Sequence, residues 1–423
     1  MTEKLLHFIW KMGYFNQSHL ITTGGEPIQV FTKGIFNTNA GPDFLNAKIK
    51  IGNVTFAGSV ELHLKTSDWQ KHRHGSDPNY ANVILHVVYE HDISLPHSIP
   101  VLELQPLISS LLRQRYDTLM QNAEAIPCGK EFAVVQELTW MSWKERLVAE
   151  RLTRKAETVF TYLYQTTNHW EETFWWLLAR NFGMKVNADA FEALARSLPL
   201  TILAKQKGSI HQLEALLFGQ AGLLANTFTE DYPKLLQQEY LFLKKKYGLQ
   251  STFISIQFLR MRPGNFPTLR LAQLAALIHS SQHLFSHMLE AKEIKEVEQW
   301  LNVTANDYWH YHYRFDERSD FKPKRLGAEM LKNIIINTVA PVLYAYGVHH
   351  KAEAYKQRAV DWLQSMKPER NAITQLYEGL GQENATAFDS QALIQLKNEY
   401  CNPKHCLDCA VGVAILKREP ASA

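Results

Sequence analysis

The stretch Val54–Lys65 reads Val-Thr-Phe-Ala-Gly-Ser-Val-Glu-Leu-His-Leu-Lys and predicts a β-strand with two different faces. Successive side chains of a strand point to opposite faces, so the valine and leucines at even-numbered positions share one apolar face. Glu61, His63 and Lys65 share the other face. The strand therefore combines a core face with a row of three ionisable groups.

Short apolar runs of the same kind surround this strand between residues 20 and 105 and are separated by turn residues. Gly52-Asn53 predicts a tight hairpin turn. The apolar side chains of the first dozen residues predict a short helix before the strands. The expected strands are Ile28–Phe31, Ala47–Ile51, Val54–Leu64, Val83–Tyr89 and Val101–Leu104.

From about residue 107 onward, apolar residues recur at the three-and-four spacing of helices. Segments 137–165, 170–182, 188–197, 209–225, 230–247, 269–290 and 329–346 follow this pattern. The sequence thus predicts an α+β protein. We expect an α/β domain at residues 1–115 and a mainly helical region at residues 116–423, which carries a C-terminal cysteine cluster.

Composition excludes some classes of protein. The 423 residues are 46% hydrophobic and 21% charged, which is typical of a globular protein. The net charge of +3 argues against a surface that is positive throughout, although a local basic groove for nucleic acid remains compatible with it. No apolar stretch reaches the length of a membrane span, and the N-terminus lacks a secretory apolar region, so we expect a cytoplasmic protein.

Asp43 precedes the expected strand Ala47–Ile51, and a hairpin to the next strand would bring it beside Glu61. Two neighbouring carboxylates favour a hard divalent cation such as Mg²⁺ or Mn²⁺. Such an ion polarises a phosphodiester and makes hydroxide available near neutral pH. His63 or Lys65 would then assist the attacking water.

Pro42-Asp43 followed by Glu61-Leu-His63 on the next strand resembles the PD-(D/E)XK superfamily of restriction, repair and recombination nucleases. The resemblance implies a restriction-endonuclease-like mixed sheet with flanking helices, and Asp43 and Glu61 as metal ligands. It also implies nucleic acid as a partner, DNA more than RNA. His63 stands where the superfamily has lysine, and Lys65 lies one pleat further along the same face.

A closer resemblance extends over nearly the whole chain. The runs Asn39-Ala-Gly-Pro-Asp-Phe, Gly-Ser-Val-Glu-Leu-His, Ser67-Asp-Trp and Val83-Ile-Leu-His-Val-Val are similar to an uncharacterised bacterial family, a domain of unknown function. This resemblance brings no established activity with it.

A histidine cluster offers a rival site. In Asp68-Trp-Gln-Lys-His72-Arg-His74 the two histidines would share a face if the segment were extended. Together with Glu61 and His63 they could bind zinc, iron or nickel. Substrate contact, metal binding and a plain surface position remain open for His72 and His74. His86 lies within an apolar strand, and we expect it to be a core histidine.

The four cysteines are unevenly spaced, with Cys128 alone and Cys401, Cys406 and Cys409 within nine residues. In a reducing compartment this pattern favours a metal over disulfides. Four thiolates suit a structural Zn²⁺ or a [4Fe–4S] cluster, and the spacing does not separate the two. The predicted role is to clip the C-terminus to the junction of the two regions.

The segment Arg260-Met-Arg262-Pro-Gly-Asn-Phe-Pro-Thr-Leu-Arg270 places three arginines around a turn before a helix that is expected to start near Thr268. Arginine forks and helix N-termini bind phosphate oxygens, so these arginines are candidate substrate contacts. The alternative is that they pair with carboxylates at a structural corner.

Three hypotheses follow. The first is a metal-dependent phosphodiesterase whose helical region holds nucleic acid. The second is a nucleic-acid-binding or scaffold protein with a degenerate site. The third is a metallohydrolase that acts on another substrate through its histidines.

Overall fold

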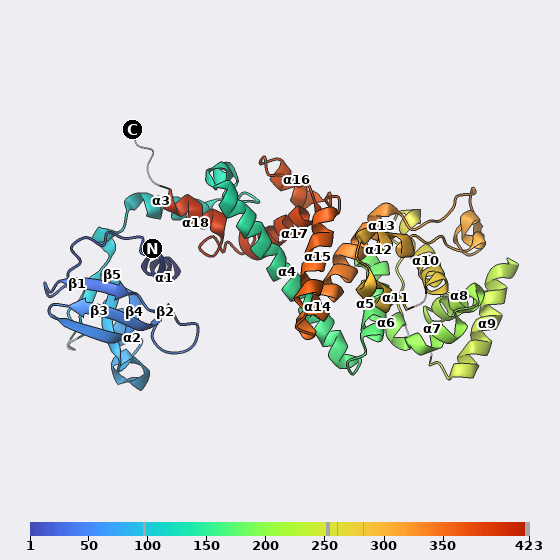
Figure 1. Ribbon diagram of the computed structural model, residues 1–423, viewed down its shortest axis with the longest axis horizontal. Helices are drawn as coiled ribbons and strands as arrows, with labels where there is room; N and C mark the ends of the chain where they lie inside the picture. The colour runs from blue at the N-terminus through green and yellow to red at the C-terminus, as the bar shows by residue number, and fades with distance from the viewer. Residues whose placement is uncertain (96–98, 251–253, 260, 282, 419–423) are drawn as a thin grey trace. The chain divides into compact units, whose positions relative to one another are not determined.

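The computed structural model describes residues 1–95, 99–250, 254–259, 261–281 and 283–418 (Figure 1). Contacts divide the chain into two compact units, Met1–Trp143 with Leu396–Ala423, and Lys144–Gln395. The first unit therefore extends beyond the border expected after residue 115, because helix α3 (Ser110–Gln121) packs against the C-terminal helix α18 (Ala410–Lys417). The mixed α+β class expected from the sequence is confirmed.

One mixed sheet forms the centre of the first unit. Its strand order is β1-β3-β4-β5-β6, with β2 also paired to β3. Strands β1, β3 and β4 are antiparallel, whereas β4, β5 and β6 run parallel. The elements of the sheet and its short helices are α1 Glu3–Met12, β1 Ile28–Thr32, β2 Ile35–Phe36, β3 Phe44–Ile51, β4 Val54–Lys65, α2 Asp68–Lys71, η1 His74–Ser76, η2 Pro78–Tyr80, β5 Val83–Glu90, β6 Val101–Glu103 and η3 Gln105–Leu107.

The hairpin of β3 and β4 fixes the register of the candidate site. Its turn pairs Ile51 with Val54, and Gly52 adopts a left-handed φ of 56°. Further along, a bulge inserts one extra residue into β3, where Asn46 is also left-handed with φ 61°. Bulges bend a strand and re-aim its side chains. After the bulge Phe44 pairs with Val60, so Asp43 arrives next to Glu61.

Both faces of β4 are buried near the site, whereas the sequence pattern suggested one polar face. Glu61 and His63 are only 5% and 2% exposed. Side chains from the two flanking helices cover them, because His7 of α1 reaches Asp43 and Trp69 of α2 packs edge-on against His63. Side chains of the two helices therefore cover Glu61 and His63. Buried ionisable groups are unusual in proteins unless they have a function.

The second unit is helical. The expected segments 137–165 and 170–182 coincide with α4 and α5, and α10 begins at Pro267, next to the predicted Thr268. Gly219 lets α8 approach α9, since a Cβ at this position would lie 2.1 Å from the Tyr240 ring. The remaining elements of the chain are η4 Gly129–Val134, α4 Glu137–Gln165, α5 Trp170–Phe182, α6 Met184–Ser197, α7 Leu200–Gln206, α8 Ile210–Gln220, α9 Asp231–Tyr247, η5 Pro263–Asn265, α10 Pro267–Ser280, α11 Leu284–Glu290, α12 Ile294–Leu301, η6 Asp307–Tyr311, β7 His312–Arg314, β8 Glu317–Arg318, α13 Ala328–Ile334, η7 Ile335–Val339, α14 Ala340–His349, α15 Glu353–Ser365, α16 Ala372–Glu378, α17 Ala387–Gln395 and η8 Leu396–Cys401.

Candidate metal centre

The β3–β4 hairpin brings the two predicted carboxylates together. The backbone N–H of Asp43 donates to Glu61 Oε2 at 3.1 Å. Asp43 Oδ2 in turn accepts the N–H of Leu62 at 2.9 Å and lies 3.2 Å from His7 Nε2. These contacts fix one oxygen of Glu61 and leave its other oxygen, Oε1, to face the histidines.

Two histidines, His63 and His74, lie near that oxygen, and His72 lies beside His63. His63 Nε2 lies 3.4 Å from Glu61 Oε1 and 3.1 Å from His72 Nδ1. His74 Nε2 lies 3.4 Å from the same carboxylate oxygen. Within the described ranges, His63, His72 and His74 form the group whose ligand atoms all lie within 4.8 Å of one another. The histidines proposed as a rival site therefore share one centre with Glu61.

Three distances between ligand atoms of these four side chains fit the spacing around a bound metal ion. An ion that holds nitrogen or oxygen ligands at about 2.0–2.1 Å separates neighbouring ligand atoms by about 3.3 Å. The three distances of 3.1, 3.4 and 3.4 Å match that separation. His74 adds independent support, because its Nε2 is buried and has no hydrogen-bond partner among the described residues. Three imidazoles with one carboxylate suit Zn²⁺ or another transition ion better than Mg²⁺.

A local turn, and not an extended segment, aims His72 and His74 at this centre. His72 ends the short helix α2, and the next residue, Arg73, is left-handed with φ 58°. His74 then starts the single turn η1. The segment is not extended, so the condition under which both histidines would share a strand face is not met, and the left-handed Arg73 turns the chain between them. Tyr80 stacks on the His74 ring at 3.8 Å and holds it in place.

The protonation states favour metal binding. Burial, and then the charge of Asp43, raises the pKa of Glu61 to about 8. Burial, and then the neighbouring imidazoles, lowers the pKa of His63 to about 3. The pKa of His74 is also lowered, by burial and by His72. A neutral imidazole has a lone pair that can bind a metal ion. A protonated Glu61 can release its proton when a metal ion binds to the carboxylate.

His86 supports the centre from behind. As expected, it is a fully buried strand residue, and its Nε2 lies 2.9 Å from His63 Nδ1. Burial lowers the pKa of His86 to about 4, so it is neutral and its Nε2 can accept a hydrogen bond from the Nδ1–H of His63. That arrangement leaves His63 Nε2 unprotonated and turned toward Glu61. A second ring nitrogen held in this way is typical of metal-binding histidines.

The other predicted site residues lie elsewhere. Lys65 is about half exposed and its ammonium pairs with Glu90 at 3.5 Å, which directs it away from Glu61. Arg260 lies outside the described residues, and Arg262 is exposed. Arg270 is buried, where its guanidinium donates to Gln273 and Asn265 and burial lowers its pKa to about 10. These partners are amides, so Arg270 does not form the carboxylate pair offered as the alternative, and its Nε has no hydrogen-bond partner among the described residues.

Sequence reasoning missed three contributors to the centre. His7 comes from a helix 36 residues before Asp43, and Trp69 and Tyr80 look like ordinary core aromatics in the sequence. A cavity of about 320 Å³ lies beside the centre and is lined by His74, Trp69, Tyr80 and residues 75–78 among others. The one available signal was the density of histidines and aromatics between residues 63 and 86.

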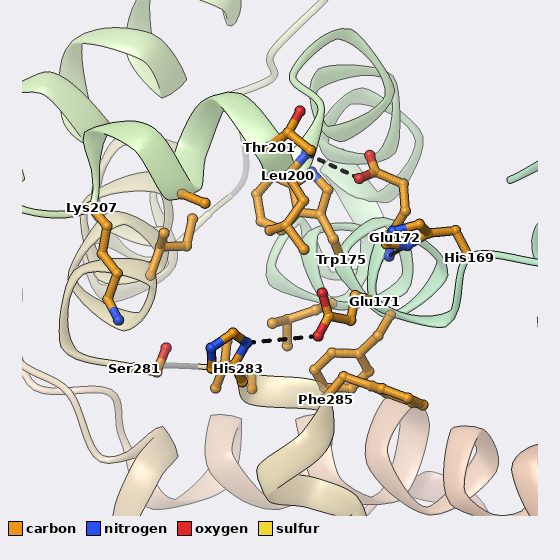
Figure 2. Close-up of a pocket in the computed structure, with 15 residues that line it drawn as sticks. His169, Glu171, Glu172, Trp175, Leu200, Thr201, Lys207, Ser281, His283 and Phe285 are labelled. Atoms are coloured by element: carbon orange, nitrogen blue, oxygen red, sulfur yellow. Dashed lines mark hydrogen bonds and ion pairs between the residues drawn. The ribbon is translucent and has the colours of Figure 1, made fainter.

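The helical unit has a cavity of its own, of about 460 Å³ (Figure 2). Figure 2 shows His283 turned toward Glu171, 3.9 Å away, and the carboxylate of Glu172 bound to the backbone N–H of Leu200 at 3.0 Å. Phe174, Trp175 and other apolar side chains form much of the wall. The wall also holds Lys207, so the cavity carries ionisable side chains of both signs beside its apolar part.

With the geometry in place, comparison with known families becomes informative. Residues 3–372 match the family described as proteins of unknown function, DUF2851. The chain belongs to this family. The match confirms the resemblance to a domain of unknown function, and it spans the histidine centre but ends before the three C-terminal cysteines. Comparisons with curated proteins and with solved structures found no match. None of the helices in the described ranges has the length and apolar character to cross a membrane.

Proposed function

We propose that this member of the DUF2851 family is a metal-dependent hydrolase of phosphodiester bonds in nucleic acid. The observation that carries the proposal is that His63, His72 and His74 hold ring nitrogens within 4.8 Å of one another, with Glu61 Oε1 lying 3.4 Å from His63 and from His74. The ion suggested by this set is Zn²⁺, Mn²⁺ or another transition ion, in place of the Mg²⁺ suggested by the two carboxylates alone.

Each side chain has a defined part in such a reaction. A bound divalent ion supplies Lewis-acid polarisation and lowers the pKa of water. Glu61 would hold the ion through Oε1 as a carboxylate, after releasing the proton that its raised pKa of about 8 lets it carry in the metal-free chain. Asp43 holds the other oxygen of Glu61 through its backbone N–H. His86 keeps His63 in the tautomer whose Nε2 faces the centre.

Two features favour a phosphodiester substrate. The first is the resemblance to PD-(D/E)XK nucleases, with Pro42-Asp43 before β3 and Glu61-x-His63 in β4, on a sheet that mixes antiparallel and parallel strands. The second is the exposed Arg73, which stands between two of the metal-binding histidines. A guanidinium at that position can bind a phosphate that approaches the centre.

The proposal is tested by cleavage assays on single- and double-stranded DNA and RNA with Zn²⁺, Mn²⁺ or Mg²⁺. Glu61→Gln removes the carboxylate charge that would hold the ion and keeps the shape, and we expect it to lower the rate by at least ~10²-fold. His19→Ala is the matched control, since His19 is an exposed histidine of the same unit and should cleave like the unmodified chain.

A second function is favoured by the contacts of Asp43, whose carboxylate already binds the N–H of Leu62 and lies beside His7. In addition, His63 stands where the PD-(D/E)XK nucleases have lysine. A chain of that kind would bind nucleic acid without cleaving it. Tight, metal-independent binding without turnover would establish this alternative and overturn the hydrolase. Metal-dependent hydrolysis of other esters, with no effect on nucleic acid, would retain the metal centre and overturn the substrate.

A further inference from the structure

The cavity of the helical unit lies between four helices and shares no residue with the histidine centre (Figure 2). Side chains of α5, α7, α10 and α11 line it, together with residues that flank these helices. Its volume of about 460 Å³ is within the range of cavities that hold small molecules. The side chains of its walls therefore indicate which kind of small molecule fits it.

One wall of the cavity is apolar and belongs to the core of the helical unit. The indole N–H of Trp175 is already used, because it donates to the backbone carbonyls of Ala195 and Leu198 at 3.2 and 3.1 Å. This side chain thus offers apolar surface to a ligand. An apolar chain or ring gains free energy when it replaces water against such a wall. The apolar side chains of the wall with exposures of only 1–7% are Phe174, Trp175, Leu178, Ile278 and Phe285.

The two carboxylates of the cavity already have partners. Glu172 accepts a hydrogen bond at each oxygen, from the backbone N–H of Leu200 at 3.0 Å and from the indole N–H of Trp176 at 3.1 Å. Glu171 lies 3.9 Å from Nδ1 of His283, and Figure 2 shows these two side chains turned toward one another. A cationic ligand would have to compete with these partners, so the two acids do not favour one.

Lys207 supplies a positive charge to the cavity. It is the C-cap of α7, is half-buried and lines the cavity. Nδ1 of His279 donates to its backbone carbonyl at 2.6 Å, which fixes the point from which the side chain extends. In Figure 2 its ammonium forms no ion pair with Glu171 or Glu172, the two acids among the described residues of the wall. The ammonium can therefore bind a negatively charged group of a ligand.

We propose that this cavity binds a small amphipathic carboxylic acid. Its carboxylate accepts hydrogen bonds from the Lys207 ammonium, and its apolar chain or ring packs against Trp175 and the neighbouring apolar side chains. A single negative charge fits better than a phosphate dianion, because Lys207 is the one lysine or arginine among the described lining residues and the two glutamates repel additional negative charge.

This site and the histidine centre have no residue in common, so each can fail its test without the other. The test is isothermal titration calorimetry of the full-length chain with three probes that share one chain length, namely octanoate, octanol and octylammonium. We expect octanoate to bind at least ~10-fold more tightly than octanol, because a charge-assisted hydrogen bond adds to the burial of the chain. Octylammonium should bind most weakly. Equal affinities, tighter binding of octylammonium or no binding of octanoate would overturn the proposal.

Variants of α7 locate the binding. Lys207→Gln should lower the affinity for octanoate by at least ~10-fold and leave that for octanol unchanged, whereas Lys205→Gln, at an exposed position of the same helix, should change neither. Ala204→Trp adds a bulky side chain from an exposed position that lines the cavity, so it should abolish binding of both probes. Octanoate affinity equal to that of the unmodified chain in Lys207→Gln or in Ala204→Trp would place the binding elsewhere and overturn the proposal.

Discussion

Each unit of the chain contains a buried cluster of ionisable side chains, around Asp389 in the helical unit and around Glu61 in the sheet unit. The first cluster stabilises the charged form of its carboxylate, whereas the second favours the neutral forms of its members. In the helical unit, Asp389 accepts from Lys144 at 2.6 Å and from the amides of Thr386 and Ala385 at 3.1 and 3.2 Å. Every contact stabilises the carboxylate. In the sheet unit, Glu61 faces His63 and His74, and the pKa values of these side chains are displaced in the direction that removes their charges.

The difference teaches how to separate a structural cluster from a functional one. Groups that serve the fold satisfy one another, because an unpaired buried polar atom costs free energy. In the sheet unit, His74 Nε2 and His86 Nδ1 are buried without a hydrogen-bond partner among the described residues. Such a set gains its missing partner when an ion binds, so the histidine centre should respond to metal and the cluster around Asp389 should not.

The largest expected effect is on metal affinity. His74→Ala removes one ligand whose Nε2 has no other partner, so we expect Zn²⁺ affinity to fall by more than ~100-fold. Calorimetric titration of the metal-free chain measures this, with His19→Ala as the control. The thermal stability of the metal-free variant should fall moderately, because the ring loses its packing against Tyr80 although no hydrogen bond is lost. Unchanged affinity would remove His74 from the centre.

The next largest effect is expected when the ion pair of Lys144 and Asp389 in the helical unit is removed. Lys144→Met leaves Asp389 as an uncompensated buried charge, so the free energy of unfolding should fall by about 3–5 kcal/mol. Urea unfolding followed by circular dichroism measures the loss. The double variant Lys144→Met with Asp389→Asn removes both charges and should recover part of it. Metal affinity should stay constant in both, and a change in it would show that the two clusters are not independent.

The sequence predicted the strands and helices better than the contacts between them. Periodicity placed β4 within one residue and α4 and α5 to the residue, because core-facing patterns are local. The hairpin also predicted that Asp43 reaches Glu61. The bulge at Asn46, the left-handed Arg73 and the approach of His7 left no pattern in the sequence, since each depends on packing between segments. The centre therefore was found as two rival sites, and the structure joins them through Glu61.

A smaller effect tests the support behind the centre. His86→Leu places an apolar side chain of similar size in β5 and removes the ring nitrogen that contacts His63 Nδ1. Loss of such a supporting contact lowers metal affinity by about 10–100-fold. Titration with Zn²⁺ measures the change, and the cleavage rate at saturating metal should fall less than the affinity. Affinity equal to that of the unmodified chain would mean that His86 only fills space.

The smallest expected effect is on the slope with which metal affinity rises with pH. Below its pKa of about 8, Glu61 carries a proton that must leave when an ion binds beside Oε1, so metal affinity should rise with pH. One released proton corresponds to about tenfold per pH unit between about pH 6 and 8, levelling off above that range. His63, whose pKa is about 3, is already neutral throughout this range and adds nothing to the slope. Glu61→Gln has no proton to release and should give a flatter profile. Titrations at several pH values measure both slopes, and equal slopes would assign the proton to another group and leave Glu61 outside the ligand set.

The same experiment on Asp389→Asn should reproduce the profile of the unmodified chain, because Asp389 pairs with Lys144 in the helical unit.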